Sequence, residues 1–150
     1  MDGVRAAGVG RPYLVRQPAG YLEYQLPISL KAVIIWRGRV PLLKNERDEW
    51  ELPGGKLELG EDPAGCLARE IEEELGWVAK VHKPLHAWVS EIRPDRHVFV
   101  LTYLATYDGD TEPIYSHEHK ALQLVRVDEI DPLNMPTPYK DAIRLAVAQT

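Results

Sequence analysis

This sequence of 150 residues has one cysteine, no long apolar run and no excess of positive charge. The lone cysteine, Cys66, has no partner for an internal disulfide, which fits a reducing compartment, so we expect a cytoplasmic protein. No stretch of about 18 apolar residues is present, which argues against a membrane-spanning helix. Residues Met1–Pro12 lack the apolar segment of a secretory signal, so we expect none there.

The formal net charge of −5 argues against a protein that coats nucleic acids, because such proteins normally present a basic face. We therefore expect neither a nucleic-acid polymer nor a membrane as a partner. The acidic side chains are concentrated: seven lie between Glu58 and Glu74, where Arg69 is the only basic residue. A phosphorylated ligand can approach this segment only with cations between the two sets of negative charge.

The length suits one domain with a substantial core, since 45% of the residues are hydrophobic and 27% are charged. Residues 1–26 are rich in Gly, Ala and Arg and then in Tyr and Pro. We expect them to form a partly flexible N-terminal arm, with residues 27–150 as the single domain.

Short apolar and β-branched runs predict strands on both sides of a central helix. The first, residues 30–36, lies between Pro27 and Gly38 and is apolar enough to be buried. Further strands are predicted at 40–44, 50–52, 78–82, 85–92, 97–107 and 121–127, with a turn at Pro53-Gly54-Gly55, a short turn at 128–133 and a closing helix at 139–148. Strands that flank two helices indicate an α/β protein with a mixed sheet between helical layers.

The central helix has clear start and stop signals. Asp62 suits the N-cap, Pro63 the first helical position, and Gly76 the position after the last turn. Between them an apolar stripe follows the helical period, at Ala64, Leu67, Ala68, Ile71 and Leu75. This stripe predicts that one face of the helix anchors it in the core.

Three carboxylates fall on the neighbouring face of the same helix. At 100° per residue, Glu70, Glu73 and Glu74 lie within an arc of about 100°, whereas Glu72 points roughly 160° away from its centre. Like charges this close repel one another, so the arrangement favours a site for a hard divalent cation, and Mg²⁺ takes carboxylate oxygens. Taken alone, these three glutamates are better explained as solvated surface side chains than as a metal site.

The segment Gly55–Trp77 resembles the Nudix hydrolase signature, and every position with a fixed identity matches. The matching residues are Gly55, Glu61, Arg69-Glu70, Ile71, Glu73-Glu74, Gly76 and Trp77. Trp77 is a mild departure, since the family more often has an aliphatic side chain there. With the full signature present, a metal site becomes a better explanation of the glutamates than a solvated surface.

The resemblance implies a Nudix-type α/β/α sandwich and hydrolysis of a phosphoanhydride in a nucleoside diphosphate linked to another group. It implies Mg²⁺ as the cofactor, with Mn²⁺ as an alternative, and a small nucleotide as the substrate. Metal ligands would be Glu70, Glu73 and Glu74 together with the backbone carbonyl of Gly54. Arg69 would orient Glu73 from four residues away, and a homodimer through the N-terminal arm is expected.

Residues outside the carboxylate cluster have open roles. The general base is expected in a late loop, where Glu118 is the first choice for catalysis and metal binding, with Glu70, Glu112 and Glu91 as alternatives. Lys56 is expected to hold a phosphate oxygen, and Trp50 either stacks on a base or packs in the core.

Three further sets of side chains could have a functional role, but each has a simpler structural explanation. His117 and His119 flank Glu118 but lack further zinc ligands nearby. Cys66 fits a packed small residue better than a ligand. The bases Lys31, Arg37 and Arg39 fit scattered surface charge better than a phosphate site.

Several functions remain open at this level. A nucleoside triphosphate is slightly favoured as substrate over ADP-ribose, a nucleotide sugar or a dinucleoside polyphosphate, whose expected extra markers are absent or displaced. A Nudix-fold module that senses a nucleotide without turnover is the alternative outside enzymes, although such modules tend to have degenerate signatures. A prenyl diphosphate isomerase is disfavoured because Cys66 lies inside the signature helix.

Overall fold

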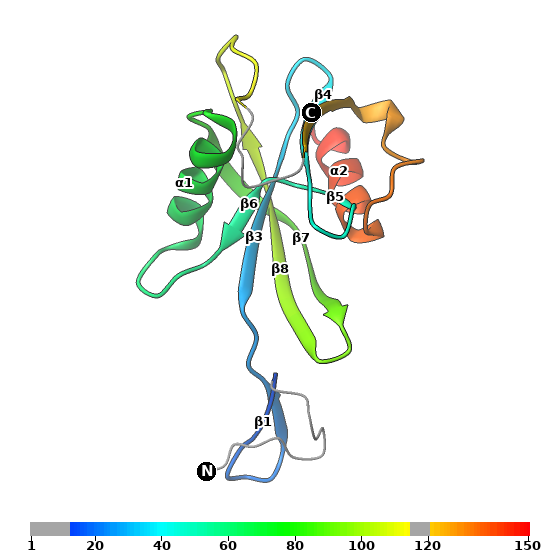
Figure 1. The fold of residues 1–150 in the computed structure, drawn as a ribbon. Helices are drawn as coiled ribbons and strands as arrows, with labels where there is room; N and C mark the ends of the chain where they lie inside the picture. The colour runs from blue at the N-terminus through cyan, green and yellow to red at the C-terminus, as the bar shows by residue number, and fades with distance from the viewer. Residues whose placement is uncertain (1–12, 115–120) are drawn as a thin grey trace.

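In the part of the chain that the structure describes, two β-sheets form the middle of the protein, and the two α-helices lie on opposite sides of them (Figure 1). The computed structural model describes residues 13–114 and 121–150. The strands in these residues are β1 (Leu14–Arg16), β2 (Leu22–Tyr24), β3 (Ile28–Ile34), β4 (Arg39–Lys44), β5 (Trp50–Glu51), β6 (Gly54–Lys56), β7 (Lys80–Arg93), β8 (Arg96–Thr106) and β9 (Ala121–Arg126). The helices are α1 (Pro63–Leu75), the short 3₁₀ helix η1 (Val127–Glu129) and α2 (Thr137–Ala148).

The larger sheet has the strand order β6-β3-β8-β7 and is mixed, because β3 runs parallel to β8 while its other neighbours are antiparallel. The smaller sheet has the order β5-β4-β9 and is antiparallel throughout. Helix α1 covers one side and α2 the other (Figure 1). The predicted α/β/α sandwich with a mixed sheet is confirmed.

Strand β3 contributes side chains to two separate cores, because successive side chains of a strand point to opposite faces. Leu30, Ala32 and Ile34 pack with the apolar stripe of α1. Val33 packs on the other side with the buried face of α2. Lys31 is two residues before Val33 and points to the same face of the strand, so its side chain also lies on the α2 side.

The segment predicted as two strands, 78–82 and 85–92, is one long strand, β7. Pro84 lies between the two predicted runs, but β7 is an edge strand, where a residue without an N–H is tolerated. Its pairing register with β8 shifts on both sides of Pro84 instead. A second difference lies at Gly54 and Gly55, which were predicted as a turn and belong to β6 beside β3.

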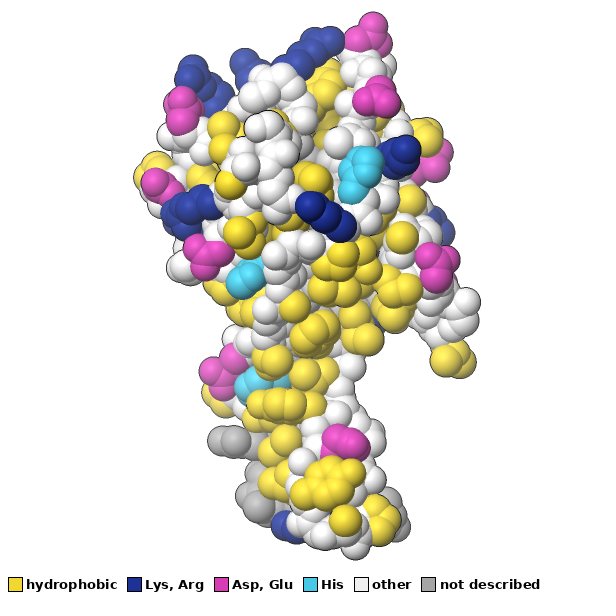
Figure 2. Space-filling view, turned by 180° about the vertical axis from the view of Figure 1, so that it is seen from behind, with side chains coloured by type: hydrophobic (Ala, Val, Ile, Leu, Met, Phe, Trp, Pro, Cys, Tyr) yellow, Lys and Arg dark blue, Asp and Glu magenta, His cyan; other side chains and the backbone are white. Residues whose placement is uncertain are grey.

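The described part of the N-terminal arm forms the hairpin β1–β2, which extends away from the body (Figure 1). Tyr21, Leu22 and Tyr24 on this hairpin are exposed. In Figure 2, hydrophobic side chains continue from the body onto the hairpin, while Lys and Arg side chains gather at the opposite end. The boundary at residue 26 and the homodimer stay predictions.

Neither α1 nor α2 is long and apolar enough to cross a membrane, which holds for every helix in the described residues.

Candidate active site

Helix α1 begins and ends as its sequence predicts. Asp62 caps the helix by accepting a hydrogen bond from the backbone N–H of Gly65 at 2.9 Å. Gly76 adopts the left-handed conformation, with φ of 72°, which glycine takes without steric cost. Its backbone N–H donates to the carbonyl oxygen of Glu72. These caps fix the helix while its apolar stripe packs on β3 and β8.

Glu74 connects the helix to strand β6. Its side chain is buried, and Oε1 accepts a hydrogen bond from the backbone N–H of Gly54 at 2.8 Å. Gly54 lies against the backbone of Leu30 with φ of 150°, so a Cβ there would overlap the Leu30 carbonyl oxygen. Only glycine therefore fits this position, and the contact holds the carboxylate of Glu74 beside the Gly54 backbone.

Glu70 lies over the next glycine of the same strand. A Cβ at Gly55 would come within 2.6 Å of Glu70 Oε2 and 2.7 Å of Oε1. The missing side chain of Gly55 is thus the space that the Glu70 carboxylate fills. Glu70 and Glu74 consequently lie over two adjacent residues of β6.

Arg69 joins three of the acidic side chains. Its Nε and Nη2 donate to Glu61 at 3.1 and 3.2 Å, and its Nη1 donates to Glu73 Oε2 at 3.0 Å. Nη1 also lies 3.4 Å from Glu70 Oε2. The hydrogen bonds to Glu73 and Glu61 raise the pKa of Arg69, so it stays charged. The predicted pair of Arg69 with Glu73 is present, and Glu61 and Glu70 share the same cation.

The oxygen atoms of this region fit a hard divalent cation. They are the carboxylate oxygens of Glu70 and Glu74, which lie close to the backbone of Gly55 and Gly54. The carboxylates are held by Arg69 and the Gly54 N–H, and within the described residues no three acidic, His or Cys side chains converge on one point. A bound ion would therefore draw Glu73, whose side chain is 53% exposed, away from Arg69.

Cys66 is a packed residue, as its plain reading suggests. Its side chain is 1% exposed, and Sγ lies 3.6 Å from the carbonyl oxygen of Lys56. Burial raises the pKa of the thiol to about 11, so Cys66 is protonated at neutral pH. A neutral, enclosed thiol suits neither a metal ligand nor an acid–base catalyst.

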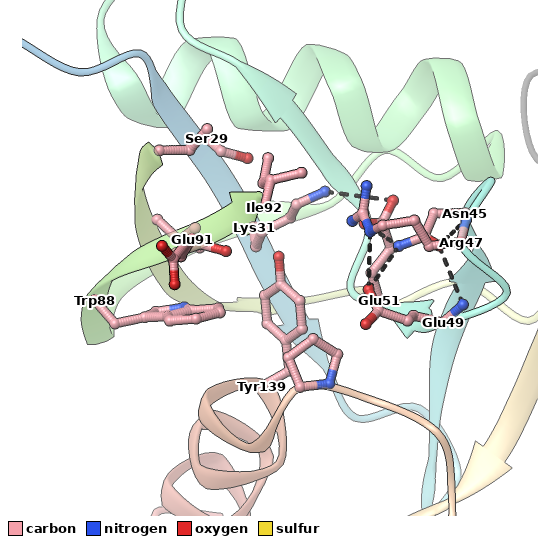
Figure 3. A pocket seen from close by; sticks show the side chains of 14 residues that line it. Ser29, Lys31, Asn45, Arg47, Glu49, Glu51, Trp88, Glu91, Ile92 and Tyr139 are labelled. Carbon is pink, nitrogen blue, oxygen red and sulfur yellow. Dashed lines mark hydrogen bonds and ion pairs between the residues drawn. The ribbon is translucent and has the colours of Figure 1, made fainter. Parts of the chain in front are cut away.

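A cavity of about 350 Å³ opens on the α2 side of the larger sheet. Figure 3 shows side chains from β3, β5, β7 and α2 around it. Its lining includes Lys31, Glu51, Trp88, Glu91 and Tyr139. The size is at the low end of small-molecule sites, which are about 300–1,000 Å³.

Lys31 is the buried cation of this cavity and was not expected there. The residue is 8% exposed, and its ion pair is with Glu51, where Nζ lies 3.9 Å from Oε2. Burial lowers the pKa of Lys31, but Glu51, Tyr139, Glu74 and Glu70 together raise it above its ordinary value. The interpretation of Lys31 as surface charge is wrong.

The other side chains proposed to bind substrate lie outside the cavity lining. Trp50 packs against the core on the α2 side, with Lys44 Nζ 5.0 Å from its ring centroid. Lys56 is exposed on β6. Trp88, on the long strand β7, is the tryptophan that lines the cavity.

The candidates for the general base lie in different parts of the chain. Glu118, with the histidines beside it, belongs to residues 115–120, which are outside the described residues. Glu91 lines the cavity, and its Oε2 lies 3.8 Å from Nε2 of His97. Glu112 lies in a different, smaller hollow beside Arg37 and Arg39.

Comparison with known proteins identifies the family to which this chain is similar. The NUDIX domain family matches residues 30–146. The 8-oxo-dGTP diphosphatase of Proteus vulgaris is 39% identical over 66 residues, which cover 44% of this chain and 58% of that protein. The ADP-ribose pyrophosphatase of Bacillus subtilis is 37% identical over 67 residues, covering 45% and 35%. The match thus spans less than two thirds of either relative.

A solved structure extends the likeness over the whole fold. The crystal structure of a MutT NUDIX hydrolase from Burkholderia pseudomallei is 30% identical, with a TM-score of 0.61, and covers 84% of this chain and 98% of that one. The chain therefore belongs to the Nudix family. The relatives' names support the enzyme class predicted from the signature, a Nudix pyrophosphohydrolase. Nudix hydrolases generally use divalent metal ions.

Proposed function

We propose that this protein hydrolyses a phosphoanhydride in a small nucleotide, with a nucleoside triphosphate or an oxidised form of one as the first choice, and that it depends on Mg²⁺ or Mn²⁺. The observation that carries the proposal is the junction of α1 and β6. There Glu74 holds the Gly54 N–H and Glu70 fills the space over Gly55. Two carboxylates are thereby fixed side by side on rigid elements, as a metal site requires.

Each residue of the junction has a part in this mechanism. Glu70, Glu73 and Glu74 would hold the cation, together with the carbonyl oxygen of Gly54. Such an ion would neutralise the charge of the phosphates and lower the pKa of the attacking water. Arg69 aligns the carboxylates of Glu61 and Glu73 through its hydrogen bonds to both.

The choice of substrate rests on the relatives. Their names include an 8-oxo-dGTP diphosphatase and an ADP-ribose pyrophosphatase, and the slight lean of the sequence towards triphosphates favours the first class. The phosphate chain would extend from the carboxylates of α1, and Lys56 would contact it from the exposed side of β6. Glu118 stays the first choice for the general base.

A panel of nucleotides tests the proposal. The panel contains the deoxynucleoside triphosphates, 8-oxo-dGTP, ADP-ribose, a nucleotide sugar and a dinucleoside tetraphosphate, each incubated with Mg²⁺ in ¹⁸O water and separated by chromatography. We expect turnover of at least one triphosphate, its loss on adding EDTA, and ¹⁸O in one product that identifies the phosphorus attacked. Tight binding without any product would instead support the non-catalytic sensing module.

A further inference from the structure

Lys31 lines the cavity from β3, the strand that pairs with β6 next to the carboxylates of α1. In the pairing of β3 with β6, Lys31 is opposite Gly54, whose N–H is bonded to Glu74. Glu51, Glu74 and Glu70 are among the groups that raise the pKa of Lys31. A ligand that starts at the α1 carboxylates and continues into the cavity would therefore pass the ammonium group.

The donors of Lys31 are available to such a ligand. Its distance of 3.9 Å from Glu51 Oε2 is longer than a hydrogen bond, and no other described residue forms an ion pair with it. Glu51 is itself held by Asn45, whose Nδ2 lies 3.4 Å from Glu51 Oε1. Lys31 thus has a countercharge in Glu51, and its side chain lines the cavity (Figure 3).

The aromatic rings of Trp88 and Tyr139 form one wall of the cavity. Trp88 and Tyr139 meet edge to face, with centroids 5.6 Å apart and planes at 90°. Such a corner offers one flat face and one ring edge to a planar group. The Nε1 of Trp88 is buried and has no acceptor among the described residues. A ligand with an aromatic ring and hydrogen-bond acceptors suits this wall better than an aliphatic one.

We propose that Lys31 is a specificity-determining residue, which binds the phosphate next to the substrate's organic group while Trp88 and Tyr139 receive the planar ring. The inference rests on the proposed function, because it takes the remaining phosphates to lie at the α1 carboxylates. Carboxylates at Glu49, Glu51 and Glu91 line the same cavity and would repel a phosphate that had no cation to meet it. Arg47 in the same lining is paired with Glu46 and Glu49, so Lys31 supplies that cation, and it selects for a nucleotide over a free nucleoside.

A binding experiment without turnover tests this assignment. Protein labelled with ¹⁵N-tryptophan is titrated, in EDTA, with each of the four deoxynucleoside 5′-monophosphates and with the matching nucleosides. The reporter is the indole resonance of Trp88, which is identified by its absence from Trp88→Phe. Lys31→Met removes the charge at similar length, and Lys80→Met on the exposed surface of β7 is the matched control.

We expect at least one monophosphate to shift the Trp88 resonance, and Lys31→Met to weaken that binding by about tenfold or more. Nucleoside binding should be the same in Lys31→Met as in the wild type, and Lys80→Met should change neither. If Lys31→Met does not fold, the double variant Lys31→Met/Glu51→Gln, which leaves no unpaired carboxylate, replaces it.

Equal weakening of nucleoside and monophosphate would overturn the inference, as would unchanged monophosphate binding in Lys31→Met. So would a Trp88 resonance that no monophosphate shifts. Because no hydrolysis is measured, these outcomes are separate from the nucleotide panel: an active enzyme with any of them keeps the proposed function and loses the role of Lys31.

Discussion

The backbone N–H of Gly54 donates a hydrogen bond to Oε1 of Glu74 at 2.8 Å, across 20 residues of sequence. This bond joins the strand that precedes the signature helix to the last turn of that helix. It gives a buried carboxylate a fixed direction without neutralising its charge.

Glu74 and Glu72 lie on different sides of α1 and should differ in their effect on catalysis. Glu74 is 5% exposed, whereas Glu72 is exposed to solvent. Glu74→Gln keeps an oxygen for the Gly54 N–H but removes the charge that would hold a cation. We expect kcat to fall by about 100-fold or more, which corresponds to roughly 3 kcal/mol of transition-state stabilisation.

Steady-state kinetics with Mg²⁺ and thermal unfolding of both variants measure this difference. Glu72→Gln should keep the kinetics of the wild type, and both variants should remain folded. Similar losses in the two variants would contradict the assignment of the carboxylates to one functional face.

Substitution of Gly54 or Gly55 by alanine should affect different properties of the protein. At Gly55 the new Cβ meets the end of the flexible Glu70 side chain, which can move away. Gly55→Ala should therefore fold normally and lose about tenfold or more in kcat. At Gly54 the Cβ meets the backbone of Leu30, which cannot move, so Gly54→Ala should lose stability by about 2 kcal/mol or more.

Chemical denaturation and kinetics on the two alanine variants separate these effects. A fully active Gly55→Ala would show that Glu70 does not need its position over β6. A Gly54→Ala protein as stable as the wild type would show that the close approach to Leu30 relaxes freely.

The thiol of Cys66 should react slowly and with a strong dependence on pH. Its pKa is raised by burial from 9.0 to about 11, and only the thiolate attacks an alkylating reagent. At pH 8 the thiolate fraction is then about 100-fold lower than in an unshifted cysteine, before enclosure is counted. The rate should rise about tenfold per pH unit up to near pH 11.

Iodoacetamide labelling followed by mass spectrometry measures this rate. Protein unfolded in urea is the control and should react at the ordinary rate of a free cysteine. Fast labelling of the folded protein near neutral pH would contradict the packed role and reopen a catalytic role for the thiol.

Trp77 should contribute to stability rather than to chemistry. Its Nε1 donates to the carbonyl oxygen of Thr111 at 2.9 Å, and its ring stacks on Tyr107 with centroids 4.2 Å apart. Trp77→Phe keeps an aromatic ring and loses the hydrogen bond, so the free energy of unfolding should fall by about 1–2 kcal/mol. Urea denaturation measures the loss, and kcat should stay at the wild-type value.

The sequence predicted the helix of the site well because its signals are local. Asp62, Pro63 and Gly76 mark the ends of α1, and the spacing of its glutamates alone separates Glu72 from the rest. The signature also identified the family, and with it the sandwich fold. These features depend on short stretches of chain, which a single sequence shows directly.

The cavity could not be predicted in the same way, because its residues come together through sheet topology. Lys31 and Trp88 meet the cavity through the parallel pairing of β3 with β8 and the placement of β7 at the sheet edge. One signal was present: Lys31 is a charged residue inside an otherwise apolar, buried strand. Such a residue seldom lies in a core without a partner or a function.

The most direct test of the account is the binding of Mn²⁺ measured by electron paramagnetic resonance, in the absence of nucleotide. We expect the wild type and Glu72→Gln to bind the ion equally, and the double variant Glu70→Gln/Glu74→Gln to bind it at least tenfold more weakly. A double variant that binds Mn²⁺ as tightly as the wild type would contradict the assignment of these carboxylates as the metal site.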